Sequence, residues 1–149
     1  MKNILIAVLV IFAISCEAPQ LEYYVPVEIT YAGYQLEMKH EINADRITHG
    51  LDVLIAENKL TEICRDYAIT MDDTRVYNHR FFLDRWVESE AEHFGEVIAI
   101  NYLTAQSNMA AFKNSAPHIN VLRNPIYKRI GIYRINNCVV IELASYYTN

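Results

Sequence analysis

Three residues in this chain have side chains that can do chemistry together: His79, Glu96 and His118. Two imidazoles and a carboxylate can form a zinc ligand set that leaves one position for a water, which zinc then activates as a nucleophile. Without a metal, an imidazole beside a carboxylate can act as a general base. Each residue also has a structural alternative: His79 as a cap of a turn, Glu96 as a partner for strand N–H groups, and His118 as a support for its loop. Their sequence separations are long, so spacing alone does not decide between these roles.

The start of the chain has the pattern of an export signal. Lys2 gives a positive first region, and residues 4–14 form an uncharged apolar run that is too short to span a bilayer. The boundary Ser15-Cys16 is similar to a bacterial lipobox, although the position three before the cysteine is Ala13, where a larger aliphatic residue is usual. The alternative is ordinary signal cleavage near Ser15 with an unmodified Cys16.

We therefore predict a signal peptide over residues 1–15, a lipid-anchored linker over 16–38 and one domain over 39–149. Lipid on Cys16 would hold the protein on a membrane, on the extracytoplasmic side of the cell envelope. The remaining cysteines, Cys64 and Cys138, either form a disulfide in an oxidising compartment or are two buried free thiols. Their wide spacing is not that of a zinc site with ligands in close pairs.

The charge of the chain excludes one class of partner. It has 13 Lys and Arg residues against 18 Asp and Glu residues, a net charge of −5, and no basic cluster. Nucleic acid is therefore not an expected partner, and no polybasic patch is present for anionic lipid. Lipid on Cys16 remains the expected route to a membrane.

The elements that must position the three residues follow from apolar periodicity and turn residues. We expect helical structure over 40–71 with a break near Gly50 and Asn58, a polar loop to Asn78, a short helix over 85–93 and a strand over 96–102. A helix from Thr104 to about 114 ends before Pro117, and a helical turn follows over 119–122. Two strands, 128–135 and 138–145, flank an Asn136-Asn137 turn. The predicted core comprises Leu54, Leu60, Tyr67, Val121, Ile132 and Ile141.

A series of short motifs runs in a fixed order from Glu41 to the C-terminus. It comprises Asn43, Arg46, Gly50-Leu51, Leu54, Leu60, Cys64, Ala68 and Met71, then His79, Gly95-Glu96-Val97-Ile98-Ala99, Phe112, Ser115, His118, Asn120-Val121-Leu122 and Ile130-Gly131-Ile132. This series resembles the CAP superfamily, the SCP-like extracellular domain, in its bacterial form. The sequence departs from the family at Val97, where Asn is usual, and at Phe112, where Trp is usual.

The resemblance implies an α+β fold, a three-layer α-β-α sandwich with a small antiparallel sheet. It also implies a cleft in which His79, Glu96 and His118 converge and in which the two histidines hold a divalent metal such as zinc. Many animal and plant members have a second glutamate in this cleft. No clear counterpart is present here, because Glu88, Glu90 and Glu92 precede the Gly-Glu step.

These features predict a non-enzymatic cell-envelope module that binds a small ligand, a lipid or an envelope protein. One alternative is an extracytoplasmic hydrolase, protease-like, with His79, Glu96 and His118 as its catalytic residues. Another is a structural envelope lipoprotein with a decayed cleft. Ser115 beside His118 has no orienting acid placed by the sequence, so a turn-capping role is expected for its hydroxyl. The missing second acid and the lack of a nucleophile motif favour a protein without catalytic activity.

Overall fold

The computed structural model describes residues 32–147, in which five helices and four strands follow one another. In chain order they are α1 (Gly33–Thr48), β1 (Ile55–Ala56), α2 (Asn58–Thr74), α3 (Phe82–Ser89), β2 (His93–Ile100), α4 (Ala105–Lys113), α5 (Ala116–Leu122), β3 (Arg129–Ile135) and β4 (Cys138–Ser145). The predicted signal peptide, Cys16 and most of the predicted linker lie outside the described residues. Between residues 32 and 147, no helix has the length and apolar character needed to cross a membrane.

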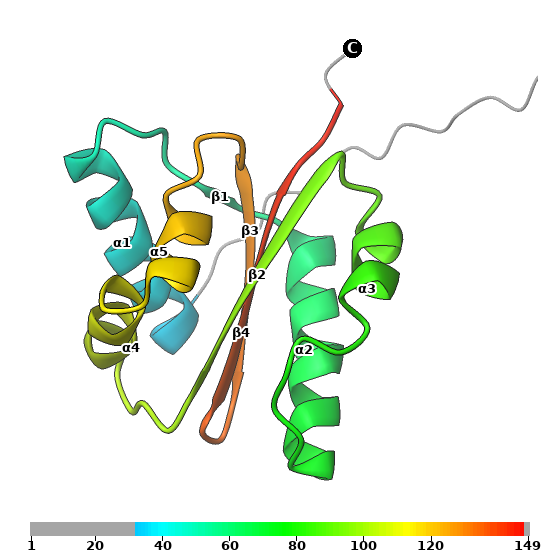
Figure 1. Cartoon of the computed structure of the whole chain (residues 1–149). Helices are drawn as coiled ribbons and strands as arrows, with labels where there is room; N and C mark the ends of the chain where they lie inside the picture. Colours follow the sequence, from blue (N-terminus) through cyan, green and yellow to red (C-terminus); the bar gives the residue numbers. More distant parts are fainter. Residues whose placement is uncertain (1–31, 148–149) are drawn as a thin grey trace, which may run out of the picture.

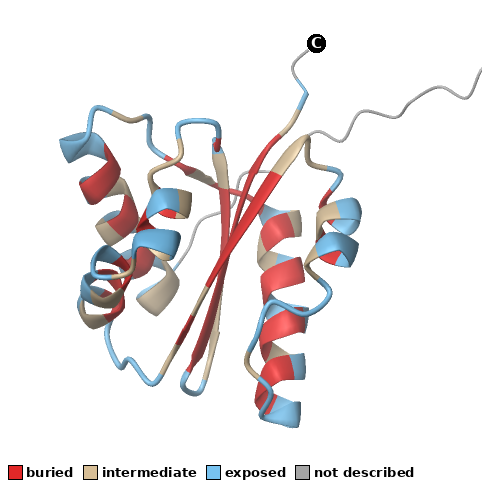
Figure 2. Ribbon diagram, in the orientation of Figure 1, coloured by how far each residue is buried: buried red, intermediate tan, exposed pale blue. Residues whose placement is uncertain are grey.

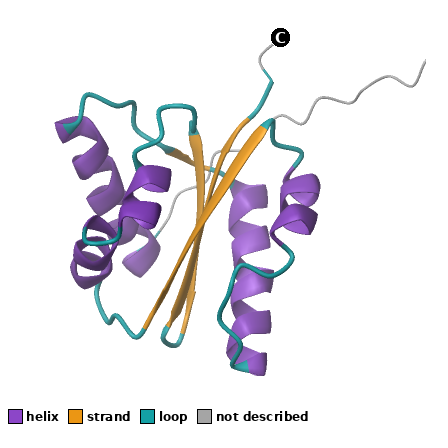
Figure 3. Ribbon diagram, in the orientation of Figure 1, coloured by secondary structure: helices purple, strands orange, loops and turns teal. Residues whose placement is uncertain are grey.

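The elements form three layers (Figure 1). The sheet has the order β1-β3-β4-β2, and α1, α4 and α5 lie on one face of it while α2 and α3 lie on the other. β2, β3 and β4 are antiparallel neighbours, and β1 adds two residues parallel to β3. The expected α+β sandwich is confirmed, with a mixed rather than purely antiparallel sheet. Figure 3 shows the same layers coloured by secondary structure.

The C-terminal hairpin and the start of α4 form where the sequence predicts them. Asn136 has a φ of 48° in the turn between β3 and β4, a left-handed conformation that Asn accepts more readily than most residues. Thr104 caps α4 by accepting a hydrogen bond from the Ser107 backbone N–H at 3.1 Å. These features depend on local chemistry, which a sequence shows directly.

The N-terminal part differs from the prediction. α1 begins at Gly33, so the last residues of the predicted 16–38 linker are helical and Met38 is buried. The predicted helical span of 40–71 included Leu54 and Ile55, but α1 ends at Thr48 and Ile55 lies in β1. The reason is the Asn43 amide, which accepts from the Leu54 N–H at 2.8 Å and donates to the Leu54 carbonyl at 3.0 Å. This side chain holds the segment extended.

A second motif residue, Arg46, fixes two loops from inside the protein. Its side chain is fully buried and donates to four backbone carbonyls that no strand uses. They belong to Asp52, Leu122, Asn124 and Tyr127, at 2.8, 2.7, 3.1 and 3.3 Å. A buried guanidinium is tolerated only when its donors are satisfied in this way. Arg46 therefore positions the end of α5, the helix that carries His118, and the segment that follows it.

The core is split by the sheet (Figure 2). Leu54, Ile132 and Ile141 pack on the side of α1, α4 and α5, whereas Leu60 and Tyr67 pack on the side of α2. The prediction of one shared core is therefore wrong, because the residues occupy both faces of the sheet. Val121 is only half-buried, and its neighbour Leu122 is the residue that α5 buries.

α2 lies very close to the sheet because β3 has a glycine beneath it. A Cβ on Gly131 would lie 2.4 Å from the Leu60 carbonyl carbon. Cys64 on α2 and Cys138 on β4 belong to the same apolar cluster between α2 and the sheet. Both are buried free thiols, which is the second of the two alternatives that the sequence left open. Burial raises the pKa of Cys64 well above its ordinary value and the pKa of Cys138 to about 11, so neither is a reactive thiolate at neutral pH.

Replacing Leu60 by Ala is expected to lower the free energy of unfolding by about 2–5 kcal/mol, because the side chain is fully buried between α2 and the sheet. Urea unfolding followed by circular dichroism measures this loss. Leu83→Ala is the matched control, since Leu83 is 68% exposed on α3, and its effect should be close to zero. Equal effects of the two substitutions would contradict the assigned packing of α2.

Candidate functional site

Two glutamates face one another across β2 and β4. Glu96 pairs with Glu142 in the antiparallel register, and each side chain is at most 1% exposed. Like charges directly opposite one another on neighbouring strands are destabilising, and burial increases the cost. A third group must therefore compensate for this pair.

Arg85 of α3 supplies the compensating charge. Its Nε donates to Glu142 Oε1 at 2.9 Å, its Nη2 donates to Glu96 Oε2, and its Nη1 donates to the Arg80 carbonyl at 2.6 Å. The guanidinium carbon also lies 3.5 Å from the centre of the Tyr67 ring, within range of a cation–π interaction. One guanidinium thus joins α2, α3, β2 and β4 at a single point.

Glu142 is the end of this network inside the protein. Burial first and the neighbouring Glu96 second raise its pKa to about 8, although Arg85 opposes both effects. Its Oε2 atom is buried and has no hydrogen-bond partner among residues 32–147. Glu142 is therefore mainly protonated at neutral pH, which leaves one guanidinium opposite one carboxylate, Glu96.

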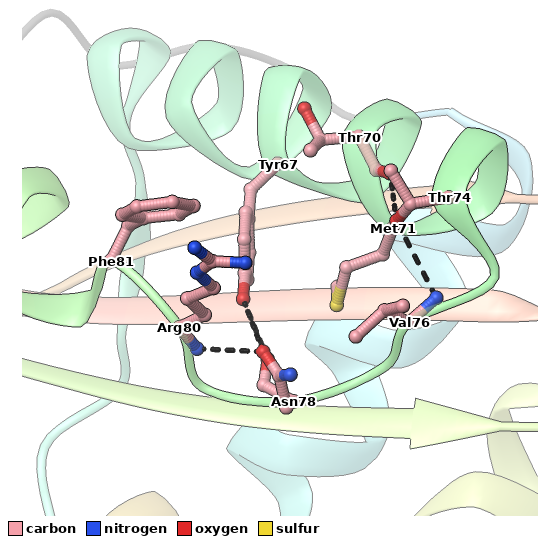
Figure 4. A pocket seen from close by; sticks show the side chains of 8 residues that line it. All are labelled: Tyr67, Thr70, Met71, Thr74, Val76, Asn78, Arg80 and Phe81. Atoms are coloured by element: carbon pink, nitrogen blue, oxygen red, sulfur yellow. Dashed lines mark hydrogen bonds between the residues drawn. The ribbon is translucent and has the colours of Figure 1, made fainter.

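His79 is the exposed end of the network. Its Nδ1 lies 2.7 Å from Glu96 Oε1, and its side chain is 55% exposed. A carboxylate oxygen accepts, so Nδ1 donates and Nε2 is the nitrogen left for the cleft. Figure 4 shows how the loop before α3 is held: the Tyr67 hydroxyl donates to the Asn78 carbonyl at 2.6 Å, and Asn78 Oδ1 accepts from the Arg80 N–H at 2.8 Å.

His118 approaches from the other layer, on α5. Its imidazole is half-buried and packs edge-to-face on Phe112, with 5.4 Å between the ring centres. Burial lowers the pKa of His118, and a charge on His79 lowers it further. The two histidines are therefore close enough to interact electrostatically, and His118 is neutral at physiological pH. The structure brings His79 and Glu96 into contact, and His118 stands near them across β2.

Two recesses flank these residues. One, of about 240 Å³, is lined by residues 98–100 of β2 together with Tyr102, Phe112, Ser115 and His118. The other, of about 150 Å³, lies between α2 and the loop before α3, on the side of that loop where Tyr67 and Met71 form the wall (Figure 4). The first recess contains His118, so it is the cleft of this site.

The fit of a metal can be judged from these contacts. Both oxygens of Glu96 are already bonded, one to His79 and one to Arg85. Within residues 32–147, no group of three or more His, Cys, Asp or Glu side chains is placed to hold a metal ion. The predicted ligand set of His79, His118 and Glu96 is therefore not assembled. Of its members, the two imidazoles are the ones that keep a nitrogen lone pair for a metal.

Sequence reasoning missed Arg85 and Glu142. Arg85 was passed over because its partners lie 11 and 57 residues away, and no local spacing reveals such pairs. Glu142 did carry a signal, since it stands between Ile141 and Leu143 in a strand that is otherwise apolar. A lone acid in a buried strand needs a buried cation, and Arg85 is that cation. Glu142 is not the missing second cleft acid, because it lies behind Arg85 and has no exposed surface.

Comparisons with known proteins agree with this architecture. A sequence model of the CAP family, described as the cysteine-rich secretory protein family, matches residues 39–142. A comparison with curated protein sequences found no match.

Three solved structures are similar in fold. An outer surface protein of Borrelia burgdorferi has 20% identity and a TM-score of 0.72 over 83% of this chain and 100% of that protein. An extracellular SCP-domain protein of Bacillus anthracis has 18% identity and a TM-score of 0.67, over 74% of this chain and 42% of that one. A cysteine-rich secretory protein of Staphylococcus aureus has 13% identity and a TM-score of 0.67, over 72% of this chain and 36% of that one.

Glu142 is expected to make the stability of the protein depend on pH. Its pKa is higher in the folded chain than the ordinary value of 4.5, so its stabilising contribution is complete below about pH 4.5 and is lost as the pH rises to about 8. Within that window the loss in the free energy of unfolding approaches about 1 kcal/mol per pH unit.

Glu142→Gln stays neutral and should remove the part of the pH dependence that Glu142 causes. Urea unfolding at a series of pH values measures this. Glu37→Gln, at an exposed position of α1 in the other layer, should leave the slope unchanged. Parallel profiles for the wild type and Glu142→Gln would contradict this assignment.

Proposed function

The chain belongs to the CAP family, the cysteine-rich secretory protein family, and on that premise we propose that it is an exported, lipid-anchored cell-envelope protein whose cleft binds a ligand without chemical turnover. Export is supported by the leader-like start of the sequence and by the outer-surface and extracellular proteins that share the fold. Anchoring rests on the lipobox-like Ser15-Cys16 boundary, so the membrane is the first expected partner.

The observation that carries the binding role is the state of Glu96. Its carboxylate is buried and bonded at both oxygens, so it holds His79 in place and is not available to accept a proton from a substrate. Ser115 makes no hydrogen bond to His118, and in the part of the chain that the structure describes neither residue has a carboxylate that orients it. A site with an oriented imidazole and no activated nucleophile is suited to recognition rather than reaction.

The two imidazoles can also hold a divalent cation. His79 presents Nε2 and His118 is neutral, which is the protonation state that a metal ligand requires. With two protein donors, any zinc site here would be weak and completed by water. Such a cation would serve ligand binding by presenting a positive charge in the cleft.

A hydrolase remains the second candidate because of one contact. The 2.7 Å bond between His79 Nδ1 and Glu96 orients the imidazole as a general base requires. Activity would then depend on His79 and Glu96 together. Under the binding proposal, purified protein shows no turnover with peptide or ester substrates, and its ligand is recovered unchanged.

Zinc titration tests the imidazole pair. We expect calorimetry at neutral pH to detect weak binding to the wild-type chain and none to a His79→Ala, His118→Ala double variant. His49→Ala is the matched control, since His49 is an exposed histidine at the end of α1, and it should bind zinc as the wild type does. Equal heats from the wild type and the double variant would remove the cation from the proposal and leave the histidines as parts of an organic ligand site.

Replacing Cys16 by Ala tests the anchor. The variant should accumulate as unprocessed precursor or be released in soluble form, because the residue that receives the lipid is gone. Detergent phase partitioning of labelled cells measures this. Cys64→Ala is the control and should stay in the membrane fraction, since Cys64 is a buried core residue. A Cys16→Ala protein that stays in the membrane fraction as firmly as the wild type would favour an uncleaved anchor.

A further inference from the structure

Among the residues that the structure describes, one edge of β2 has no partner strand. Within residues 32–147 its only neighbour in the sheet is β4, and Figure 1 shows it as the front strand, with α4 and α5 on one side and α2 and α3 on the other. At its two ends, the Glu92 N–H donates to the Ser145 carbonyl and the Asn101 N–H donates to the Asn137 carbonyl, both at 2.9 Å. The backbone N–H and C=O groups of odd-numbered residues of β4 therefore point toward β2.

The register then fixes which backbone groups of β2 point away from the sheet. Because residues of an antiparallel pair alternate between facing inward and facing outward, Val97 and Ala99 bond to β4 while Ile98 and Ile100 direct their N–H and C=O groups outward. Phe94 also faces outward, and its carbonyl is satisfied by the Tyr127 hydroxyl at 3.1 Å. The backbone groups of Ile98 and Ile100 have no hydrogen bond to any other residue between 32 and 147.

This edge lacks several of the features that usually prevent strand addition, although Glu96 is a charged residue that points inward from β2. β2 pairs with β4 through eight consecutive residues without a bulge, and it contains neither Pro nor Lys. Natural sheets commonly protect a free edge with such features. Here His79 and His118 stand on opposite faces of the strand, and the Tyr127 hydroxyl covers the Phe94 carbonyl at one end of the edge.

A recess of about 240 Å³ lies directly beside the free groups. Its walls are Ile98 to Ile100, Tyr102, Phe112 and His118, so they are mainly apolar with one neutral imidazole. A cavity of roughly 150 Å³ is enough to accept a benzene ring. This recess therefore has room for one aromatic or large aliphatic side chain from a ligand whose backbone follows β2.

We infer that the ligand of this cleft is an extended peptide segment that adds as a strand to the free edge of β2. Its main chain pairs with the outward groups of Ile98 and Ile100, as in other complexes formed by strand addition, and one large apolar side chain enters the recess beside His118. His79 lies over the opposite face of the strand and contacts the peptide from that side. The inference rests on the proposed binding function and names the class of ligand.

A displayed library of linear peptides, selected on the full-length chain, tests this inference. We expect binders with a large apolar residue in the centre, and we expect bound peptide to slow amide hydrogen exchange at Ile98 and Ile100 but not at Ala99, which the ladder already protects. Ile98→Pro removes an outward N–H without removing a β2–β4 bond, and it should weaken binding by roughly tenfold or more. Ile98→Ala loses the same side chain from the wall of the recess but keeps that N–H, so it is the matched control and should bind the peptide more tightly than Ile98→Pro does.

If Ile98→Pro does not fold, methylation of peptide nitrogens supplies the same test. Methyl groups on alternate residues should abolish binding in one register, where the nitrogens face β2, and spare it in the other. The inference is overturned if no linear peptide is selected, if the Pro and Ala variants bind equally, or if exchange at Ile98 is unchanged. Retained zinc binding and a retained Cys16 anchor in those cases would leave the proposed function standing and remove only the peptide.

Discussion

A guanidinium held between two facing glutamates, Glu96 and Glu142, is the interaction on which the site depends. The register of β2 and β4 places Glu96 opposite Glu142 in the interior, and Arg85 makes that arrangement tolerable by bonding to both. Removing one member of a buried ion cluster commonly costs about 3–5 kcal/mol, because the remaining charges lose their partner. Arg85 also bonds to the Arg80 carbonyl, so α3, the loop before it and the sheet are fixed together.

The cleft follows from this constraint. Glu96 is fixed by Arg85 and in turn fixes Nδ1 of His79, so an exposed imidazole is connected to a buried acid through one guanidinium. His118 reaches the same place from the other layer because Arg46 ties down the loop that follows α5. β2 runs between the two histidines and supplies both the carboxylate and the open edge. The site is thus a property of one strand and the two layers that cover it.

The sequence predicted the parts of the fold that local chemistry determines. The hairpin at Asn136 and the start of α4 at Thr104 each depend on one residue and its neighbours, and both are where they were expected. β1 was missed because it has two residues and is held by Asn43 from a distance. The contact of His79 with Glu96 came from the family resemblance, since a separation of 17 residues gives no periodic signal. The role of Arg85 could be identified only from the structure, because the strand register determines which glutamates it bonds to.

The tautomer of His79 tests the central claim most directly, and long-range ¹H–¹⁵N correlation spectra measure it at a pH where the imidazole is neutral. If Arg85 and Glu96 orient this ring, the proton is on Nδ1 and the lone pair is on Nε2 in the wild type, and Glu96→Gln restores the Nε2–H form that a free imidazole side chain prefers. His40, an exposed histidine of α1, serves as the reference in the same spectra. An Nε2–H tautomer for His79 in the wild-type protein would contradict the account.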